Sequence, residues 1–178
     1  MEGLIEIITN VWEQGFLGIG MTEIIISMLI FIVGAISRAF FVGRVLKWLE
    51  NLTAHTDSEI DDVLLESLKK PLGYIPMTVA LYFITVYLPL TGMADAFATN
   101  LVKAMIAFTI FSALANSVAP IFQVFTSTAV LTRSMTMWLE RAARIIIWII
   151  GLGIILDIFG IQIGPLVAGL GLFSVAVA

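Results

Sequence analysis

Residues 160–178 read GIQIGPLVAGLGLFSVAVA, a stretch that carries no charged side chain and is rich in small residues. Seven of the seventeen residues from Gln162 to Ala178 are Gly, Ala or Ser. Pro165 fits the first turn of a helix, where its missing N–H would be unpaired in any case, so we expect a helix that starts near Gly164. Helical spacing gives one face made of Gly164, Ala168, Gly171, Val175 and Ala178, with Gly169, Ser174 and Ala176 on its flanks.

Small residues on a membrane helix permit close packing with neighbouring helices. Apolar side chains gain nothing by leaving lipid for one another, so helices in a bilayer associate through close approach of their backbones. Glycine costs about 1 kcal/mol relative to Ala in a helix in water, so its enrichment needs a packing reason. The stretch therefore indicates either a helix packed inside a monomeric bundle or one member of a ring of identical helices around a pore.

The composition is typical of an integral membrane protein. Of the 178 residues, 60% are hydrophobic and 12% are charged, and the mean hydropathy is +1.08. We expect no separate soluble domain in this chain and, with a net charge of -4, no nucleic-acid partner. The absence of cysteine excludes disulfides and thiolate metal sites. The chain begins MEGLIEII, acidic where a signal peptide would be basic, so we expect this segment to be retained.

Apolar runs predict an all-α membrane protein with about five transmembrane helices. The first four are residues 24–42, 74–90, 101–125 and 138–159, and the fifth is the C-terminal stretch from Gly164 onward. Residues 1–21 mix apolar and acidic positions at helical spacing, which predicts an amphipathic helix at the membrane interface. Peripheral transmembrane helices then occupy residues 22–134, and a final helix hairpin occupies residues 135–178.

Residues 51–70 form a polar, amphipathic connection between the first two spans. Thr56 followed by Glu59 is a capping-box pattern, which predicts the start of a helix. One face of that helix is apolar and the other acidic: Ile60, Val63, Leu64 and Leu68 against Asp61, Asp62 and Glu66. The acids lack the Gly and the ligand spacing of a calcium loop, so we predict a solvated helix face and no metal site. We expect Pro71 to end this helix.

The basic residues predict the orientation, because Lys and Arg are retained on the cytoplasmic side of a membrane. Seven of them fall in the first and third connections: Arg44, Lys47, Lys69, Lys70, Arg133, Arg141 and Arg144. The N-terminal segment, the second connection and the final turn hold none, and only Lys103, just inside the third span, goes against the pattern. We therefore expect an outer N-terminus, a cytoplasmic connection at residues 51–70, and a last helix that runs toward the cytoplasm.

Arg38 and Asn116 are two of the polar residues inside predicted spans. Arg38 comes six residues before Arg44, about 9 Å deeper at 1.5 Å per residue, so it can reach the headgroups by snorkelling. A contact with a lipid phosphate is its alternative role. Asn116 either hydrogen-bonds across helices or lies beside a water path. Pro120 predicts a kink near the end of the third span.

The sequence carries no recognisable catalytic apparatus. The spans hold no Cys, no His, no HExxH or GxSxG motif and no paired carboxylates, so we expect neither an enzyme nor a cofactor. A carrier coupled to an ion would place ionisable residues near mid-bilayer, whereas Arg38 and Asp157 lie toward span ends. The Gly/Pro interruption between Gly160 and Pro165 fits the broken helix of a carrier, which keeps a secondary transporter as the alternative.

The last quarter of the chain resembles a known family. Arg144 opens an Ile/Leu-rich span with Asp157 near its end, and the turn Gly160-Ile-Gln-Ile leads to Pro165-Leu-Val-Ala-Gly-Leu-Gly171. This pattern is similar to the last two membrane helices of the small-conductance mechanosensitive channel (MscS) family, here in a larger multi-span form. The resemblance implies a pore-lining final helix, a homo-oligomeric ring of seven copies, and a cytosolic vestibule of β and α/β domains that would follow Ala178.

The same resemblance implies a function. We expect a tension-gated, weakly selective channel for inorganic ions in a bacterial inner membrane, with a periplasmic N-terminus, that releases solutes under hypo-osmotic stress. An apolar constriction at Val175 is the implied gate, which would close by dewetting. The candidate contacts for membrane lipids are Arg38, Arg44, Arg141 and Arg144. A non-conducting membrane scaffold remains a further alternative.

Overall fold

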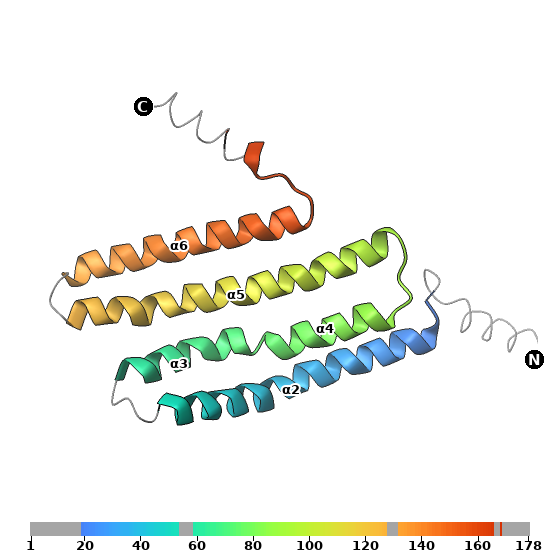
Figure 1. Cartoon of the computed structure of the whole chain (residues 1–178), viewed down its shortest axis with the longest axis horizontal. Helices are drawn as coiled ribbons and strands as arrows, with labels where there is room; N and C mark the ends of the chain where they lie inside the picture. Colours follow the sequence, from blue (N-terminus) through green and yellow to red (C-terminus); the bar gives the residue numbers. More distant parts are fainter. Residues whose placement is uncertain (1–18, 54–58, 128–131, 166–167, 169–178) are drawn as a thin grey trace, which may run out of the picture.

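The computed structural model describes residues 19–53, 59–127, 132–165 and 168, and these residues form an all-helical structure. The predicted fold class is confirmed at this level. Figure 1 shows the five helices that these residues contain: α2 (Met21–Thr53), α3 (Glu59–Leu72), α4 (Ile75–Tyr87), α5 (Met93–Ser127) and α6 (Arg133–Ile158).

The helices lie side by side in four rows, with α3 and α4 placed end to end in a single row (Figure 1). Each row contacts the next one: α2 packs against both α3 and α4, α5 packs against the other side of the same two helices, and α6 packs against α5. Successive rows run in opposite directions, so that the end of α2, the start of α3, the end of α5 and the start of α6 share one end of the bundle.

Two of these helices are long and apolar enough to cross a membrane. They are the segments Met21–Asn51 of α2 and Met93–Gln123 of α5, whose most apolar 18-residue windows have mean hydropathies of 2.4 and 1.8. Only 11% and 28% of their most apolar windows are buried, whereas the core helix of a soluble protein would be mostly buried. Large apolar side chains are exposed along α2, α4, α5 and α6, as a surrounding of lipid requires.

The predicted spans and the observed helices agree in place but not in length. The predicted span 24–42 lies inside α2, which continues to Thr53 through the polar residues beyond the apolar run. The predicted span 101–125 lies inside α5, which begins eight residues earlier at Met93 and contains Pro120 within the helix. α4 and α6 are not among the helices that are long and apolar enough to cross a membrane. α4 has only 13 residues, and the 26 residues of α6 include five charged side chains.

The break between α3 and α4 corrects the prediction that Pro71 ends its helix. The helix continues to Leu72, and Pro71 is among the most deeply buried residues described. A proline in the last turn removes one hydrogen bond only, so its burial outweighs that loss. The turn is closed by the N–H of Gly73, which donates to the carbonyls of Lys69 and Lys70 at 3.2 and 3.1 Å. The predicted capping residue Thr56 lies outside the described residues, which resume at Glu59 already in helix.

Small residues make the contacts between rows. Most of the buried apolar side chains are Ala or Val: Ala80, Val102, Ala104, Ala107, Ala115 and Val118. Buried glycines serve the same purpose at two crossings. Gly34 of α2 faces Ala80 of α4, and Gly151 of α6 faces the Phe111 side chain of α5. These positions let helix backbones approach closely, as expected in a membrane bundle.

A bulky residue at Gly34 is expected to separate α2 from α4. A Cβ atom there would overlap the Cβ of Ala80 and lie 3.2 Å from the carbonyl oxygen of Pro76, so Gly34→Ile should lower the free energy of unfolding by about 1–3 kcal/mol through overpacking. Gly43→Ile on the same helix is the matched control, because nothing lies within 4 Å of a Cβ atom at Gly43. Thermal unfolding in detergent measures both variants, and equal melting temperatures would contradict this packing.

Candidate functional site

The final turn of the described chain is a defined helix ending. The N–H of Ile161 donates to the carbonyl of Leu156 at 3.0 Å, and the N–H of Gly160 donates to the carbonyl of Asp157 at 2.8 Å. Gly160 has φ +79°, a left-handed conformation that glycine adopts without a steric cost. These two hydrogen bonds and the positive φ form a Schellman motif, which ends α6 at Ile158.

The segment after this turn lies against neighbouring helices. The Phe159 ring packs 5.7 Å from the Phe97 ring at the start of α5. Ile163 approaches α6 again, because a Cβ atom at Gly153 would lie 3.2 Å from its Cδ1 atom. Helical conformation then resumes at Gly164 and Pro165. The turn predicted over residues 160–164 is therefore present, and it reverses the chain where α6 ends.

Two members of the predicted small-residue face lie within the described residues. Gly164 and Ala168 are helical and exposed, and a Cβ atom at Gly164 would have nothing within 4 Å. The other members of the predicted pore-lining set, and with them the predicted gate, lie outside the described residues: Gly169, Gly171, Ser174, Val175, Ala176 and Ala178.

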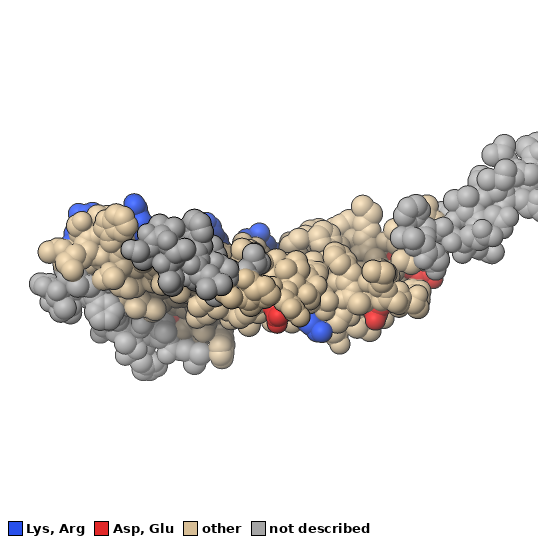
Figure 2. All heavy atoms as spheres, turned by 90° about the horizontal axis from the view of Figure 1, so that it is seen from above, with Lys and Arg blue, Asp and Glu red and all other residues tan. Residues whose placement is uncertain are grey.

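Most basic residues lie in one half of the bundle, which contains α3, the last parts of α2 and α5 and the first part of α6. We call it the basic half, and it lies toward the left end of Figure 1. Figure 2 shows most of the visible Lys and Arg toward this end. The basic half carries Arg38, Arg44, Lys47, Lys69, Lys70, Arg133, Arg141 and Arg144, and the first, fourth and fifth of these lie near the middle of the bundle, beside the break between α3 and α4. The opposite end carries Glu23, Asp95 and Asp157 among its charged residues, and Lys103 lies in the half of α5 nearer to that end.

The four candidate lipid contacts are all exposed, but their surroundings differ. Arg144 forms an ion pair with Glu140 one turn earlier, with 2.7 Å between Nη2 and Oε1. Arg44 lies over the Phe40 ring, with its Cζ atom 4.3 Å from the ring centroid. The Cζ atom of Arg38 lies 5.7 Å from the centroid of the Tyr74 ring, which connects α2 to the start of α4. Arg38 thus reaches across to another row, whereas the contacts of Arg44 and Arg144 lie on their own helices.

A cavity of about 320 Å³ lies beside Arg38, between α2 and α3. We call it the basic pocket, and it is lined by Ala35, Arg38, Ala39, Val42, Lys69 and Lys70. The small side chains of Ala35 and Ala39 on either side of Arg38 leave this space open. The sequence alone does not show that Arg38 and the two lysines lie together. They meet because α3 and α4 are placed end to end beside α2, which is a tertiary feature.

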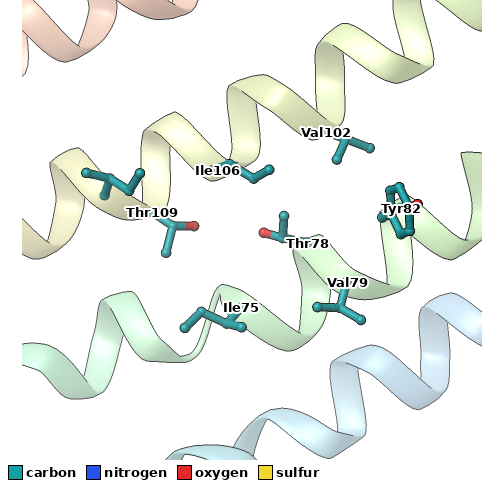
Figure 3. A pocket seen from close by; sticks show the side chains of 8 residues that line it. Ile75, Thr78, Val79, Tyr82, Val102, Ile106 and Thr109 are labelled. Atoms are coloured by element: carbon teal, nitrogen blue, oxygen red, sulfur yellow. The ribbon is translucent and has the colours of Figure 1, made fainter.

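A second cavity, of about 400 Å³, lies between α4 and α5 and is shown in Figure 3. Its lining is apolar apart from two threonines and a tyrosine: Ile75, Thr78, Val79, Tyr82, Val102, Ile106, Thr109 and Ile110. Both threonine hydroxyls donate to carbonyls of their own helices, Thr78 to Tyr74 at 2.9 Å and Thr109 to Met105 at 2.7 Å. The cavity therefore offers a surface for apolar groups and no group suited to catalysis.

The polar side chain predicted inside the third span bonds within its own helix. The Nδ2 atom of Asn116 donates to the carbonyl of Ser112 at 2.7 Å and lies 3.3 Å from its hydroxyl oxygen. This satisfies an amide in an apolar region without a partner on another helix. Among the residues that the structure describes, no group of three or more His, Cys, Asp or Glu side chains is placed to hold a metal ion.

Comparisons with known proteins complete this description. No protein-family model, curated protein or solved structure matches the chain. The arguments for function therefore come from the residues, from the geometry described above and from the resemblance of residues 141–178 to one channel family.

Proposed function

We propose that this chain is the membrane part of a tension-gated, weakly selective ion channel that assembles as a homo-oligomeric ring. The main support for the proposal is the turn after α6. The Schellman motif at Gly160 ends α6, and helical conformation resumes at the uncharged residues Gly164 and Pro165. Small residues continue from this start at helical spacing. A helix of this composition suits close packing around a common axis.

The remaining helices supply the contact with lipid that tension sensing requires. Tension favours the state that occupies more membrane area, and it acts only through a difference between states. α2 and α5 have membrane-spanning length, and their apolar side chains are largely exposed. α6 packs against α5 and ends at the turn. Movement of α5 within the bilayer would therefore be passed through α6 to the final helix, which we assign to the pore.

Charge favours one orientation for this channel. Eight of the nine Lys and Arg residues lie in the basic half of the bundle, and the rule for basic residues assigns that side to the cytoplasm. The N-terminus and the final turn then lie on the outer side, in the periplasm of a bacterial inner membrane. The small-residue helix starts at the outer side and runs toward the cytoplasm, as the resemblance implies.

Patch-clamp recording under a suction ramp tests the proposal, with the purified full-length protein in liposomes. We expect discrete currents with weak preference among inorganic ions that appear above a reproducible tension. Empty liposomes and liposomes with a heat-inactivated sample are the controls. Silence under tension, in a preparation shown by protease protection to be correctly inserted, would contradict the channel and favour the carrier or the scaffold, which substrate-uptake assays then separate.

A further inference from the structure

The basic pocket has the chemistry of an anion site. Three cationic side chains from two helices line it, Arg38 from α2 and the neighbouring Lys69 and Lys70 from α3, and its lining contains no acidic residue. Glu66 pairs with Lys69 at 3.4 Å, but both side chains are mostly exposed, at 76% and 52%, so this pair is weak and leaves the lysine available. Guanidinium and ammonium groups together bind phosphate through charge-assisted hydrogen bonds.

The backbone at the break between α3 and α4 positions the arginine. The Arg38 guanidinium lies against Gly73, where a Cβ atom would overlap its Nε atom and lie 3.1 Å from both Cζ and Nη2. On its other side, the guanidinium approaches the Tyr74 ring. Gly73 is buried, and no larger residue fits there without displacing Arg38. The absence of a side chain at Gly73 thus leaves room for the guanidinium at this place.

The depth of the pocket and the surface beside it point to a lipid. Arg38 lies about 9 Å further along α2 than Arg44, toward the apolar part of the helix, at 1.5 Å per residue. Met28 and Ile32 share a helix face with Ala35, about two turns and one turn from the pocket, respectively. Their side chains are 65% and 42% exposed, so an apolar track leads away from the cationic groups. A cationic pocket beside an exposed apolar surface matches a phospholipid, which carries a phosphate group at one end and hydrocarbon chains at the other.

We propose that the basic pocket binds the phosphate group of an anionic phospholipid, whose acyl chain lies along Met28 and Ile32 of α2. Arg38 holds the phosphate from the membrane side, and Lys69 and Lys70 hold it from the water side. The site links α2 to α3 through a lipid, so it is occupied whether or not the final helix forms a pore. This inference does not depend on the proposed channel.

Native mass spectrometry of the full-length protein in detergent tests the site, by measuring the apparent dissociation constant for dioleoyl phosphatidic acid. The triple variant R38Q/K69Q/K70Q should bind this lipid about tenfold more weakly or worse, as loss of several charge-assisted contacts requires. The matched control K47Q/K103Q/R133Q removes three exposed positive charges that are neither in the pocket nor among the candidate lipid contacts, and it should keep the affinity. Equal losses in the two triple variants would overturn the proposal, because net charge alone would then explain binding.

A geometric variant tests the position of Arg38 without a change of charge. Gly73→Ala adds a methyl group that pushes the guanidinium away, and the far end of an arginine can move at little cost to folding. Binding of phosphatidic acid should weaken several-fold, while Gly43→Ala, at an open position on α2, should leave it unchanged. Circular dichroism verifies the helix content of each variant. Full affinity in a folded Gly73→Ala protein would overturn the proposed geometry.

Competition distinguishes the possible sources of the phosphate. Dioleoylglycerol has the same acyl chains without the phosphate, and glycerol 3-phosphate has the phosphate without the chains. Neither should displace phosphatidic acid at equal concentration. Displacement by dioleoylglycerol would show that the pocket recognises only hydrocarbon, and displacement by glycerol 3-phosphate would show a site for a soluble phosphate. Either result would overturn the lipid assignment.

Discussion

Gly151→Val is expected to destabilise the protein by about 1–3 kcal/mol, because it overpacks the contact between α5 and α6. Gly151 is buried, and a Cβ atom there would lie 2.7 Å from Cγ and 2.8 Å from Cβ of Phe111. The Cβ atom of Phe111 is fixed to its backbone, so relief requires the helices to move apart. Thermal unfolding in detergent measures the loss, and channel recording would show whether the threshold tension shifts with it.

Gly153→Val is the control for this substitution. The two glycines are two residues apart on α6, so they share helix propensity but point to different sides. A Cβ atom at Gly153 would meet only the Cδ1 atom of Ile163, at 3.2 Å, and the end of that side chain can move. We expect a much smaller loss of stability than at Gly151. Similar melting temperatures for the two variants would contradict the packing of α5 against α6.

Val175→Ser is expected to give a channel that leaks at rest or opens at lower tension. If Val175 forms the apolar constriction, each Val-to-Ser substitution reduces the hydrophobic transfer free energy of that side chain by roughly 1–2 kcal/mol, at about 0.8 kcal/mol per methyl-sized group. The effect is repeated in every subunit of the ring, so a small change per chain becomes a large change in the closed state. A hydroxyl group also favours water in the pore, which opposes closure by dewetting.

Val86→Ser provides the same chemical change away from the proposed pore. Val86 lies on α4 and is 66% exposed, so its substitution alters the outer surface of the bundle. We expect currents and threshold close to those of the unmodified channel. Both variants are recorded by patch clamp with a suction ramp at matched protein density. An unchanged threshold and no resting leak in the Val175→Ser channel would remove Val175 from the role of gate.

The all-α class and the position of α2 and α5 could be predicted because apolar runs are a local property. The actual ends of these helices could not. α2 continues past its apolar run to Thr53, because charged residues such as Lys47 are good helix formers and Leu46 is buried in this part of the bundle. Hydropathy detects contact with lipid, whereas packing against the next row also supports the helix beyond its apolar run.

The basic pocket could not be predicted for a different reason. Arg38 and Lys69 are separated by thirty positions, and they meet only because α3 stops at Leu72 and α4 starts at Ile75 in the same row. The sequence does contain Pro71, Gly73 and Pro76 at this point, which predict an interruption. The direction of the helix after that interruption is set by its contacts with α2 and α5, which a local sequence pattern does not encode. The final turn was easier to predict, because a glycine such as Gly160 readily adopts the left-handed conformation that ends a helix.

The division of one row into α3 and α4 leaves that row poorly matched to a bilayer. With 13 residues, α4 is about 20 Å long, whereas the hydrocarbon core is about 30 Å thick. α2 and α5 on either side are long enough to cross it fully. If α4 alone crosses the hydrocarbon core, the lipids next to it thin or the row sinks toward one leaflet, and each response costs energy for every ångström of mismatch. Membrane thickness would then act on this protein directly, so short-chain and long-chain lipids would favour different positions of the row.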